Sequence, residues 1–152
     1  MFEEKIQQMG VTIPSAAKPL AAYIPALQIG NLVMTSGQVP IADGIIKYQG
    51  KVGKDISEEH GKEAAKLCAL NCLGAIKNLI GSLNKIKRVV KLTVFVSSAE
   101  GFTSQPKIAN GASEFIAEIF GEAGMHTRSA VGVSELPLNA AVEIEMIVEL
   151  ST

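Results

Sequence analysis

The chain has 152 residues, enough for one domain with a full core, and we expect a single domain over residues 1–152. Hydrophobic residues make up 47% of the chain, but no apolar run reaches the roughly 18 residues that would suggest a membrane span, and the acidic N-terminus lacks the apolar core of a signal peptide. The net charge of −1 gives no global attraction to nucleic acid or to acidic membranes, so we expect a cytoplasmic protein that binds neither.

The first part of the chain is predicted to be extended and then to fold back on itself. Two prolines oppose regular structure within residues 1–22, which are therefore expected to be extended. Apolar residues at 26–29 and 32–36 flank a glycine–asparagine turn, a pattern typical of a β-hairpin. Residues 44–48 favour a short third strand.

Two helices are predicted. The first begins near Ser57, a good N-cap that two glutamates follow. Its apolar residues recur at three- and four-residue spacing and form one stripe, which includes both cysteines as core thiols: Ala65, Cys68, Cys72, Ile76, Leu79 and Leu83. The second helix is predicted to begin within residues 104–106, where a proline is tolerated in the first turn, and Gly121 can supply its C-terminal cap.

Three further strands are predicted at 89–96, 127–135 and 140–150. The resulting order, ββ(β)-α-β-α-β-β, is that of an α+β domain with two helices on one face of a mixed sheet. Even-numbered residues of the strand at 89–96 are all apolar, whereas its odd-numbered face mixes apolar and polar residues. That mixture suits a contact between subunits or a lined cleft, so we expect copies of the chain to cover the second face of the sheet.

Arg128 is the most informative single residue. It is one of only two arginines, with Arg88, and lies in the largely apolar stretch 127–133. A guanidinium stays charged at any working pH, so it needs an anion nearby, and its planar fork suits a carboxylate or a phosphate. The segment leaves two interpretations open: a structural ion pair with Glu143 or Glu145, or a site for an acidic ligand.

Other polar residues among the apolar strands give weaker signals. Glu143 is the best acid–base candidate, because burial should raise the pKa of its carboxyl group unless an arginine lies nearby. Ser36 has no partner histidine and aspartate that would make it a nucleophile, and His60 and His126 fit neither a triad nor a metal site. The glycine-bearing loop 50–53 is interpreted as a turn, and we expect no metal or cofactor.

Four segments, in the right order, resemble the Rid family, also called the YjgF or reactive-intermediate deaminase family and once labelled L-PSP endoribonuclease. The resemblance covers about Tyr23 to Leu150, and its motifs are residues 31–40, 91–96, 128–131 and 136–145. It implies a chorismate-mutase-like α+β fold that assembles as a homotrimer, in which the sheets form a central barrel and ligand clefts lie between subunits.

The resemblance also implies an activity. Members of the deaminase branch hydrolyse reactive 2-imino (enamine) acids to 2-keto acids and ammonia without a metal or cofactor. The family's carboxylate-binding arginine falls on Arg128, and the glutamate that positions or activates water falls on Glu143. Further substrate contacts fall on Ser36, on Ala130, and on Tyr23 of the neighbouring subunit.

The chain departs from the family pattern in two loops and at two single positions. It has extra residues in the loop Tyr48–Ile56 and at 101–106. Gly132 replaces a side chain that is often found four residues after the arginine, and Ser113 stands where many members carry asparagine. These changes would reshape the cleft.

Two other functions remain open. One is a non-catalytic trimeric protein that binds a small carboxylate metabolite through Arg128. The other is RNA cleavage, as the older family label suggests, although the near-neutral charge argues against it.

Overall fold

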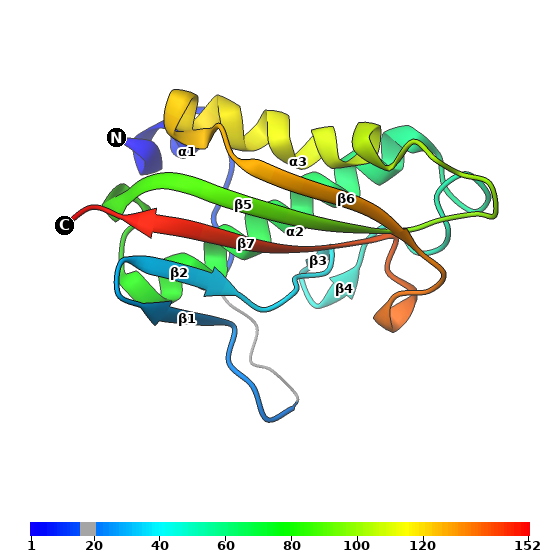
Figure 1. Ribbon diagram of the computed structural model, residues 1–152, viewed down its shortest axis with the longest axis horizontal. Helices are drawn as coiled ribbons and strands as arrows, with labels where there is room; N and C mark the ends of the chain where they lie inside the picture. The colour runs from blue at the N-terminus through cyan, green and yellow to red at the C-terminus, as the bar shows by residue number, and fades with distance from the viewer. Residues whose placement is uncertain (16–20) are drawn as a thin grey trace.

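The computed structural model describes residues 1–15 and 21–152. Its main sheet has five strands in the order β1-β2-β7-β5-β6, and all neighbouring pairs are antiparallel except β5 and β6, which are parallel. The predicted mixed sheet is therefore confirmed (Figure 1). The strands are β1 (Ala26–Ile29), β2 (Leu32–Thr35), β5 (Ile86–Ser97), β6 (Thr127–Val133) and β7 (Val142–Leu150).

Helices α2 (Glu58–Ile80) and α3 (Gln105–Phe120) cover one face of this sheet, as predicted (Figure 1). The Ser57 side chain caps α2 by accepting a hydrogen bond of 3.1 Å from the backbone N–H of His60. Helix α3 ends at Gly121, whose φ of 60° lies in the region that favours glycine. The core between helices and sheet is apolar and includes both cysteine thiols.

Residues 1–22 are not extended throughout, which corrects the prediction for this segment. Helix α1 (Phe2–Gln8) buries Ile6, and the ring of Phe2 packs 4.6 Å from that of Phe120 at the end of α3. The prolines that argued for extended chain come after this helix, and residues 16–20 lie outside the described residues. Contacts with α3 therefore stabilise a helix too short to be evident from its sequence pattern.

The predicted third strand at 44–48 is shorter than expected. Only β4 (Ile45–Ile46) is formed, and it pairs with β3 (Ile41–Ala42) in a small separate hairpin. The two turn residues, Asp43 and Gly44, have φ values of 53° and 76°, as a tight turn of this kind requires. The hairpin is not part of the main sheet.

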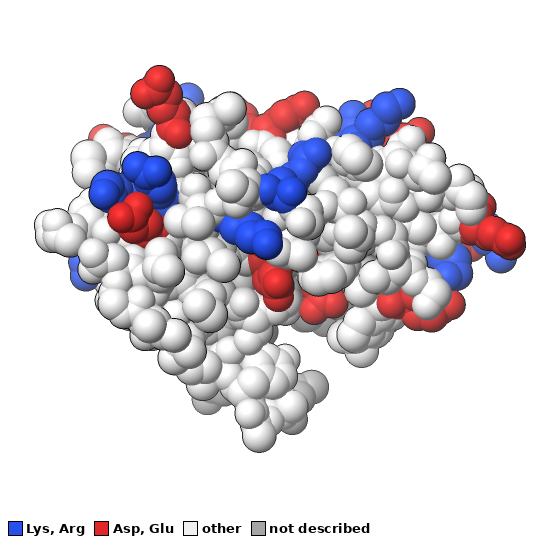
Figure 2. All heavy atoms as spheres, in the orientation of Figure 1, with Lys and Arg blue, Asp and Glu red and all other residues white. Residues whose placement is uncertain are grey.

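The second face of the main sheet, which we call the open face, is not covered by α2 or α3. Viewed from this side, charged side chains are scattered over a largely uncharged surface (Figure 2). Several exposed or half-exposed apolar side chains belong to it: Leu27, Ile29, Leu32, Met34, Phe95, Val131 and Ile147. Among the described residues, no helix is long and apolar enough to span a bilayer.

Candidate functional site

Arg128 is the second residue of the edge strand β6 and points to the helix-covered face of the sheet. Its partner in β5 is Leu92, whose side chain is fully buried beneath the helices. The Nη1 atom of Arg128 donates hydrogen bonds to Asn110 Oδ1 at 2.8 Å and to Ser113 Oγ at 3.1 Å, both on α3. Asn110 and Ser113 face the arginine together because they are three residues apart on one helix.

Of the two interpretations of Arg128, the structural ion pair with Glu143 or Glu145 is not formed within the described chain. Both glutamates lie on β7 opposite odd-numbered residues of β5, and their side chains therefore point to the open face. Arg128 aligns with an even-numbered residue of β5 and points the other way. The positive charge is therefore met by two neutral oxygen atoms and by no carboxylate among the described residues.

The remaining donors of Arg128 are available for a ligand. A guanidinium has five N–H donors, and Nη1 uses its two for Asn110 and Ser113. The Nε–H and both Nη2 hydrogens have no acceptor within residues 1–15 and 21–152. These two nitrogens form one edge of the fork, and such an edge can bind both oxygens of a carboxylate.

The hydrogen bonds continue from Ser113 to His126, which completes what we call the Arg128 network: Asn110, Ser113, His126 and Arg128. His126 Nε2 lies 2.9 Å from Ser113 Oγ, and Nδ1 lies 2.7 Å from the carbonyl oxygen of Gly124. Burial lowers the pKa of His126, the charge of Arg128 lowers it further, and the contact with Gly124 acts against both. An open pocket of about 300 Å³ lies beside Ser113, His126 and Arg128.

Glu143 occupies a half-buried position on the open face. Burial raises the pKa of its carboxyl group, and the negative charge of Glu145 raises it further. The carboxyl group lies directly over the backbone of Gly37: a Cβ atom there would be 2.9 Å from Glu143 Cδ and closer still to Oε1. Gln38, the next residue, pairs with Ile144 through two backbone hydrogen bonds of 2.7 and 3.0 Å, which hold this approach in place.

Ser36 immediately precedes Gly37 and is hydrogen-bonded to the segment that follows Tyr23. The Ser36 hydroxyl donates a 2.6 Å hydrogen bond to the carbonyl oxygen of Ile24, and the Ser36 N–H donates one of 2.8 Å to that of Pro25. The hydroxyl therefore anchors the segment that follows Tyr23, whose side chain is 56% exposed. That a neighbouring subunit supplies the tyrosine stays a prediction.

The predicted site residues thus form two groups within one chain. Arg128 and Ala130 share the helix-covered side of β6, whereas Glu143 belongs to the open face together with Gly37 and its neighbour Ser36. The β5 partners of Arg128 and Glu143 are three residues apart, which corresponds to about 10 Å along the strands. One chain does not bring these two side chains together.

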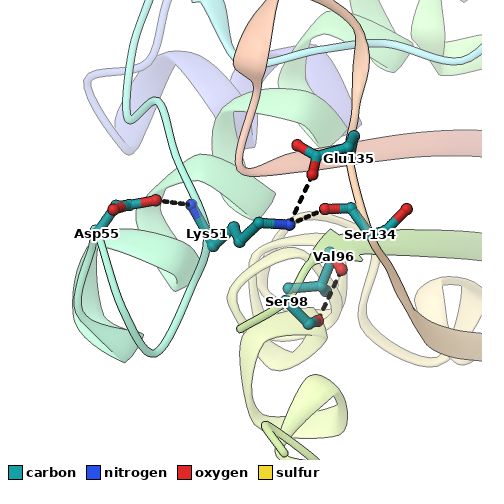
Figure 3. Close-up of polar contacts among 6 residues, drawn as sticks. All are labelled: Lys51, Asp55, Val96, Ser98, Ser134 and Glu135. Atoms are coloured by element: carbon teal, nitrogen blue, oxygen red, sulfur yellow. Dashed lines mark hydrogen bonds and ion pairs between the residues drawn. The ribbon is translucent and has the colours of Figure 1, made fainter. Parts of the chain in front are cut away.

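The extra residues at Tyr48–Ile56 brace the connection between β6 and β7. Lys51 Nζ donates to the carbonyl oxygen of Ser134 and lies 3.1 Å from Glu135 Oε1, while the Lys51 N–H donates to Asp55 Oδ2 at 2.8 Å (Figure 3). Ser98, which directly follows β5, lies near these contacts, and its hydroxyl donates a 2.7 Å hydrogen bond to the carbonyl oxygen of Val96 (Figure 3). The loop therefore steadies the chain just before Glu143.

The extra residues at 101–106 account for Gly132. A Cβ atom at Gly132 would lie 2.6 Å from Gln105 Nε2 and 3.0 Å from Ser98 Oγ. Gln105 donates to both Ser98 Oγ, at 3.2 Å, and the carbonyl oxygen of Phe102, at 2.8 Å. The glutamine therefore fills the space that a side chain at position 132 would occupy.

Sequence reasoning missed two members of the Arg128 network. Asn110 has no role in the sequence-based expectations, and His126 is expected there only to belong to neither a triad nor a metal site. The available signal was the three-residue spacing of Asn110 and Ser113, which puts both polar side chains on one face of the second, amphipathic helix. No group of three or more potential metal ligands occurs in the part of the chain that the structure describes.

The order of the strands and the placement of α2 and α3 on a single face put the protein among α+β proteins with a chorismate-mutase-like fold. A family model described as "YjgF/chorismate_mutase-like, putative endoribonuclease" matches residues 3–150. The chain belongs to this family.

Individual relatives agree with this assignment. Protein TCP17 of Trypanosoma cruzi is 42% identical over 147 residues, which are 96% of this chain and 92% of the relative. A 2-iminobutanoate/2-iminopropanoate deaminase of Dermatophagoides farinae is 33% identical over 138 residues, 91% of this chain and 93% of the relative. The crystal structure of a protein of unknown function from Agrobacterium tumefaciens superposes with a TM-score of 0.90 at 44% identity, covering 99% of this chain and 92% of the other.

Proposed function

We propose that this protein is a hydrolytic deaminase that converts reactive 2-imino acids to 2-keto acids and ammonia. One observation carries the proposal. Asn110 and Ser113 of α3 hold Nη1 of Arg128, whereas the Nε and Nη2 donors have no acceptor among the described residues. The relative from Dermatophagoides farinae, named as a deaminase of this kind, supports the same reaction.

The chemistry requires little beyond placement. An iminium carbon is already electrophilic, so the enzyme must fix the substrate and position a water molecule. Arg128 would bind the carboxylate with two parallel hydrogen bonds, a contact worth on the order of 1.5–3 kcal/mol. Glu143, whose pKa is raised by burial, is suited to accept a proton from the attacking water, typically a contribution of about 10²–10⁴-fold. The water adds to the iminium carbon as Glu143 accepts one of its protons. Glu143 then returns that proton to the nitrogen, and the carbon–nitrogen bond breaks as the new hydroxyl gives up its proton to the leaving ammonia and becomes the keto group.

Two chains must contribute to such a site. Arg128 and Glu143 point to opposite faces of one sheet, so a cleft containing both needs Arg128 from one copy and Glu143 from its neighbour. The apolar residues of the open face give the copies a surface to bury against one another. We propose a homotrimer with three such clefts, in which Ser36, Ala130 and Tyr23 contact the substrate.

The activity test couples an amino-acid oxidase, which generates the imine, to trapping of that imine as a semicarbazone. The protein should lower the semicarbazone yield, and Arg128→Ala should lose this effect. Arg88→Ala is the matched control, because Arg88 is exposed and pairs with Glu149 at 3.2 Å on the surface. The proposal fails if the wild-type protein has no effect, or if both alanine variants retain it.

The division of the site between chains has its own test. Arg128→Ala and Glu143→Gln subunits are each inactive alone, and they are unfolded and refolded together in equal amounts. If clefts combine residues from two subunits, about a quarter of them regain both native side chains. No recovery of activity in trimers that contain both variants would contradict a shared cleft.

A binding protein without turnover is the second candidate. Its supporting observation is that the Arg128 network is complete within one chain and does not need Glu143. Calorimetry with 2-ketobutyrate distinguishes the two functions: saturable binding that Arg128→Ala abolishes, without turnover of imine by the wild-type protein, favours this alternative.

A further inference from the structure

Arg128, Ser113 and His126 are joined by hydrogen bonds, and the protonation of His126 decides which atom donates and which accepts between Ser113 and the ring. The carbonyl oxygen of Gly124 can only accept, so the Nδ1 atom that lies 2.7 Å away must carry a proton. In a neutral ring Nε2 is then an acceptor, and the hydroxyl of Ser113, 2.9 Å away, donates to it. The lone pairs of Ser113 Oγ are thereby left facing Nη1 of Arg128, 3.1 Å away.

A protonated His126 cannot maintain this arrangement. Both ring nitrogens would donate, so Ser113 Oγ would meet two positively charged donors and its own proton would have to turn elsewhere. The charged residues that line the same pocket as the ring are Arg128 on β6 and Glu114 of α3, and Glu122 lies on the 3₁₀ turn Gly121–Gly124 that supplies the carbonyl contact of the ring. Burial and the charge of Arg128 lower the pKa of His126, so the neutral ring is the stable form near neutral pH.

We infer that Ser113 and neutral His126 are positioning residues: together they hold Nη1 of Arg128 so that the Nε–Nη2 edge keeps one direction toward the substrate carboxylate. This inference rests on the proposed role of Arg128 as the carboxylate-binding residue. We call the hydrogen bonds that run from His126 through Ser113 to Arg128 Nη1 the relay. Asn110 accepts from the same Nη1 atom but is not part of the relay, because its amide does not titrate and, within the described chain, makes no hydrogen bond to His126.

Kinetics of three variants test the relay. Ser113→Ala removes the oxygen, and His126→Phe keeps the ring shape but removes both nitrogens. His126→Gln keeps a neutral acceptor in place of Nε2. Ser113→Ala should raise KM about tenfold with kcat nearly unchanged, because Nη1 of Arg128 loses one of its two acceptors and water replaces it in part. His126→Phe should also raise KM with kcat nearly unchanged, because the Ser113 hydroxyl loses the acceptor that keeps its lone pairs directed toward Nη1. His126→Gln should stay close to the wild type.

The pH dependence separates positioning from a purely structural role. In the wild type KM should rise as the pH falls through the pKa of His126, whereas in His126→Gln that rise should be absent. A structural role alone would lower the thermal stability of the variants and leave the pH dependence of KM unchanged. Equal pH dependence of KM in both proteins would overturn the inference.

A second measurement does not depend on enzymatic activity. The chain has only two arginines, so its Nε–H groups give two resonances in a ¹⁵N-labelled sample, and Arg88 serves as the internal reference. Rotation about the Nε–Cζ bond of Arg128, measured as exchange between its two ¹⁵Nη resonances, should accelerate in Ser113→Ala and His126→Phe because Nη1 is released, and it should stay unchanged at Arg88. That result in a protein without deaminase activity would sustain the relay and refute only the proposed function. Unchanged exchange at Arg128 in both variants would refute the relay, whatever the activity.

Discussion

Gly37→Ala is the sharpest test of the role of Glu143, because it moves the carboxyl group without changing its chemistry. The added Cβ atom would lie 2.9 Å from Glu143 Cδ and 3.1 Å from Cγ, and it would overlap Oε1. The backbone φ of Gly37 is not positive, so alanine is compatible with the turn itself. The carboxyl group must withdraw by about 1 Å, and a displacement of that size costs on the order of 10²-fold in rate. This corresponds to about 2.7 kcal/mol of activation free energy.

The assay is steady-state imine hydrolysis, with thermal unfolding measured in parallel. We expect kcat to fall about 10²-fold while KM changes little, because Arg128 and not Glu143 binds the carboxylate. Gly132→Ala is the control, since the atoms nearest its Cβ atom would be the flexible end of Gln105 and the side chain of Ser98, and not Glu143. A Gly37→Ala enzyme with wild-type kcat would show that the position of Glu143 does not set the rate, and the assignment of Glu143 as the base would be withdrawn.

Two predictions concern stability. Thr35→Val should destabilise the fold by about 1–3 kcal/mol in urea unfolding, because the buried hydroxyl accepts from the backbone N–H of Met146 at 3.1 Å and valine cannot replace that acceptor. An unchanged unfolding midpoint would mean that this N–H finds another partner. Lys51→Ala should change global stability by less than about 1 kcal/mol but should speed proteolysis of residues 134–139, whereas Lys54→Ala should do neither.

The helices and the central strands could be predicted from sequence because their signals are local. Ser57 and Gly121 mark helix ends through hydrogen bonding and backbone conformation that need no distant partner. In β7 apolar residues alternate with mostly charged ones, and the structure buries Val142, Ile144, Met146 and Val148 on the face beneath α2. Such patterns depend only on the period of the element.

The partners of Arg128 could not be predicted in this way, because they depend on register. Whether Arg128 and Glu143 share a face is decided by their alignment with Leu92 and Phe95 of β5, and no local pattern in β6 or β7 fixes that alignment. The same limit explains α1, which is stabilised by contact with Phe120, a residue far from it in the sequence. The three-residue spacing of Asn110 and Ser113 fixes only that they share a helical face, and it contains no information that they lie beside the arginine.

The separation of Arg128 from Glu143 has a consequence for the pH dependence of the proposed reaction. If the two side chains were adjacent in one chain, they would form an ion pair. The guanidinium would then lower the pKa of the carboxyl group, and the carboxylate would take up the donors that a substrate needs. Because the two side chains are apart, Glu143 does not take up the Nε and Nη2 donors of Arg128, and burial raises the pKa of the Glu143 carboxyl group. In an assembled cleft the neighbour's guanidinium would act against that rise until a substrate carboxylate neutralises it. The pKa of Glu143 should therefore be higher with substrate bound, and since protonated Glu143 cannot act as a base, activity is lost as the pH falls through that value. In the His126→Gln background, where His126 does not contribute to the pH dependence of KM, the acid limb of kcat should then lie at higher pH than the acid limb of kcat/KM. Coincident limbs in that variant would argue that Arg128 and Glu143 do not share a cleft.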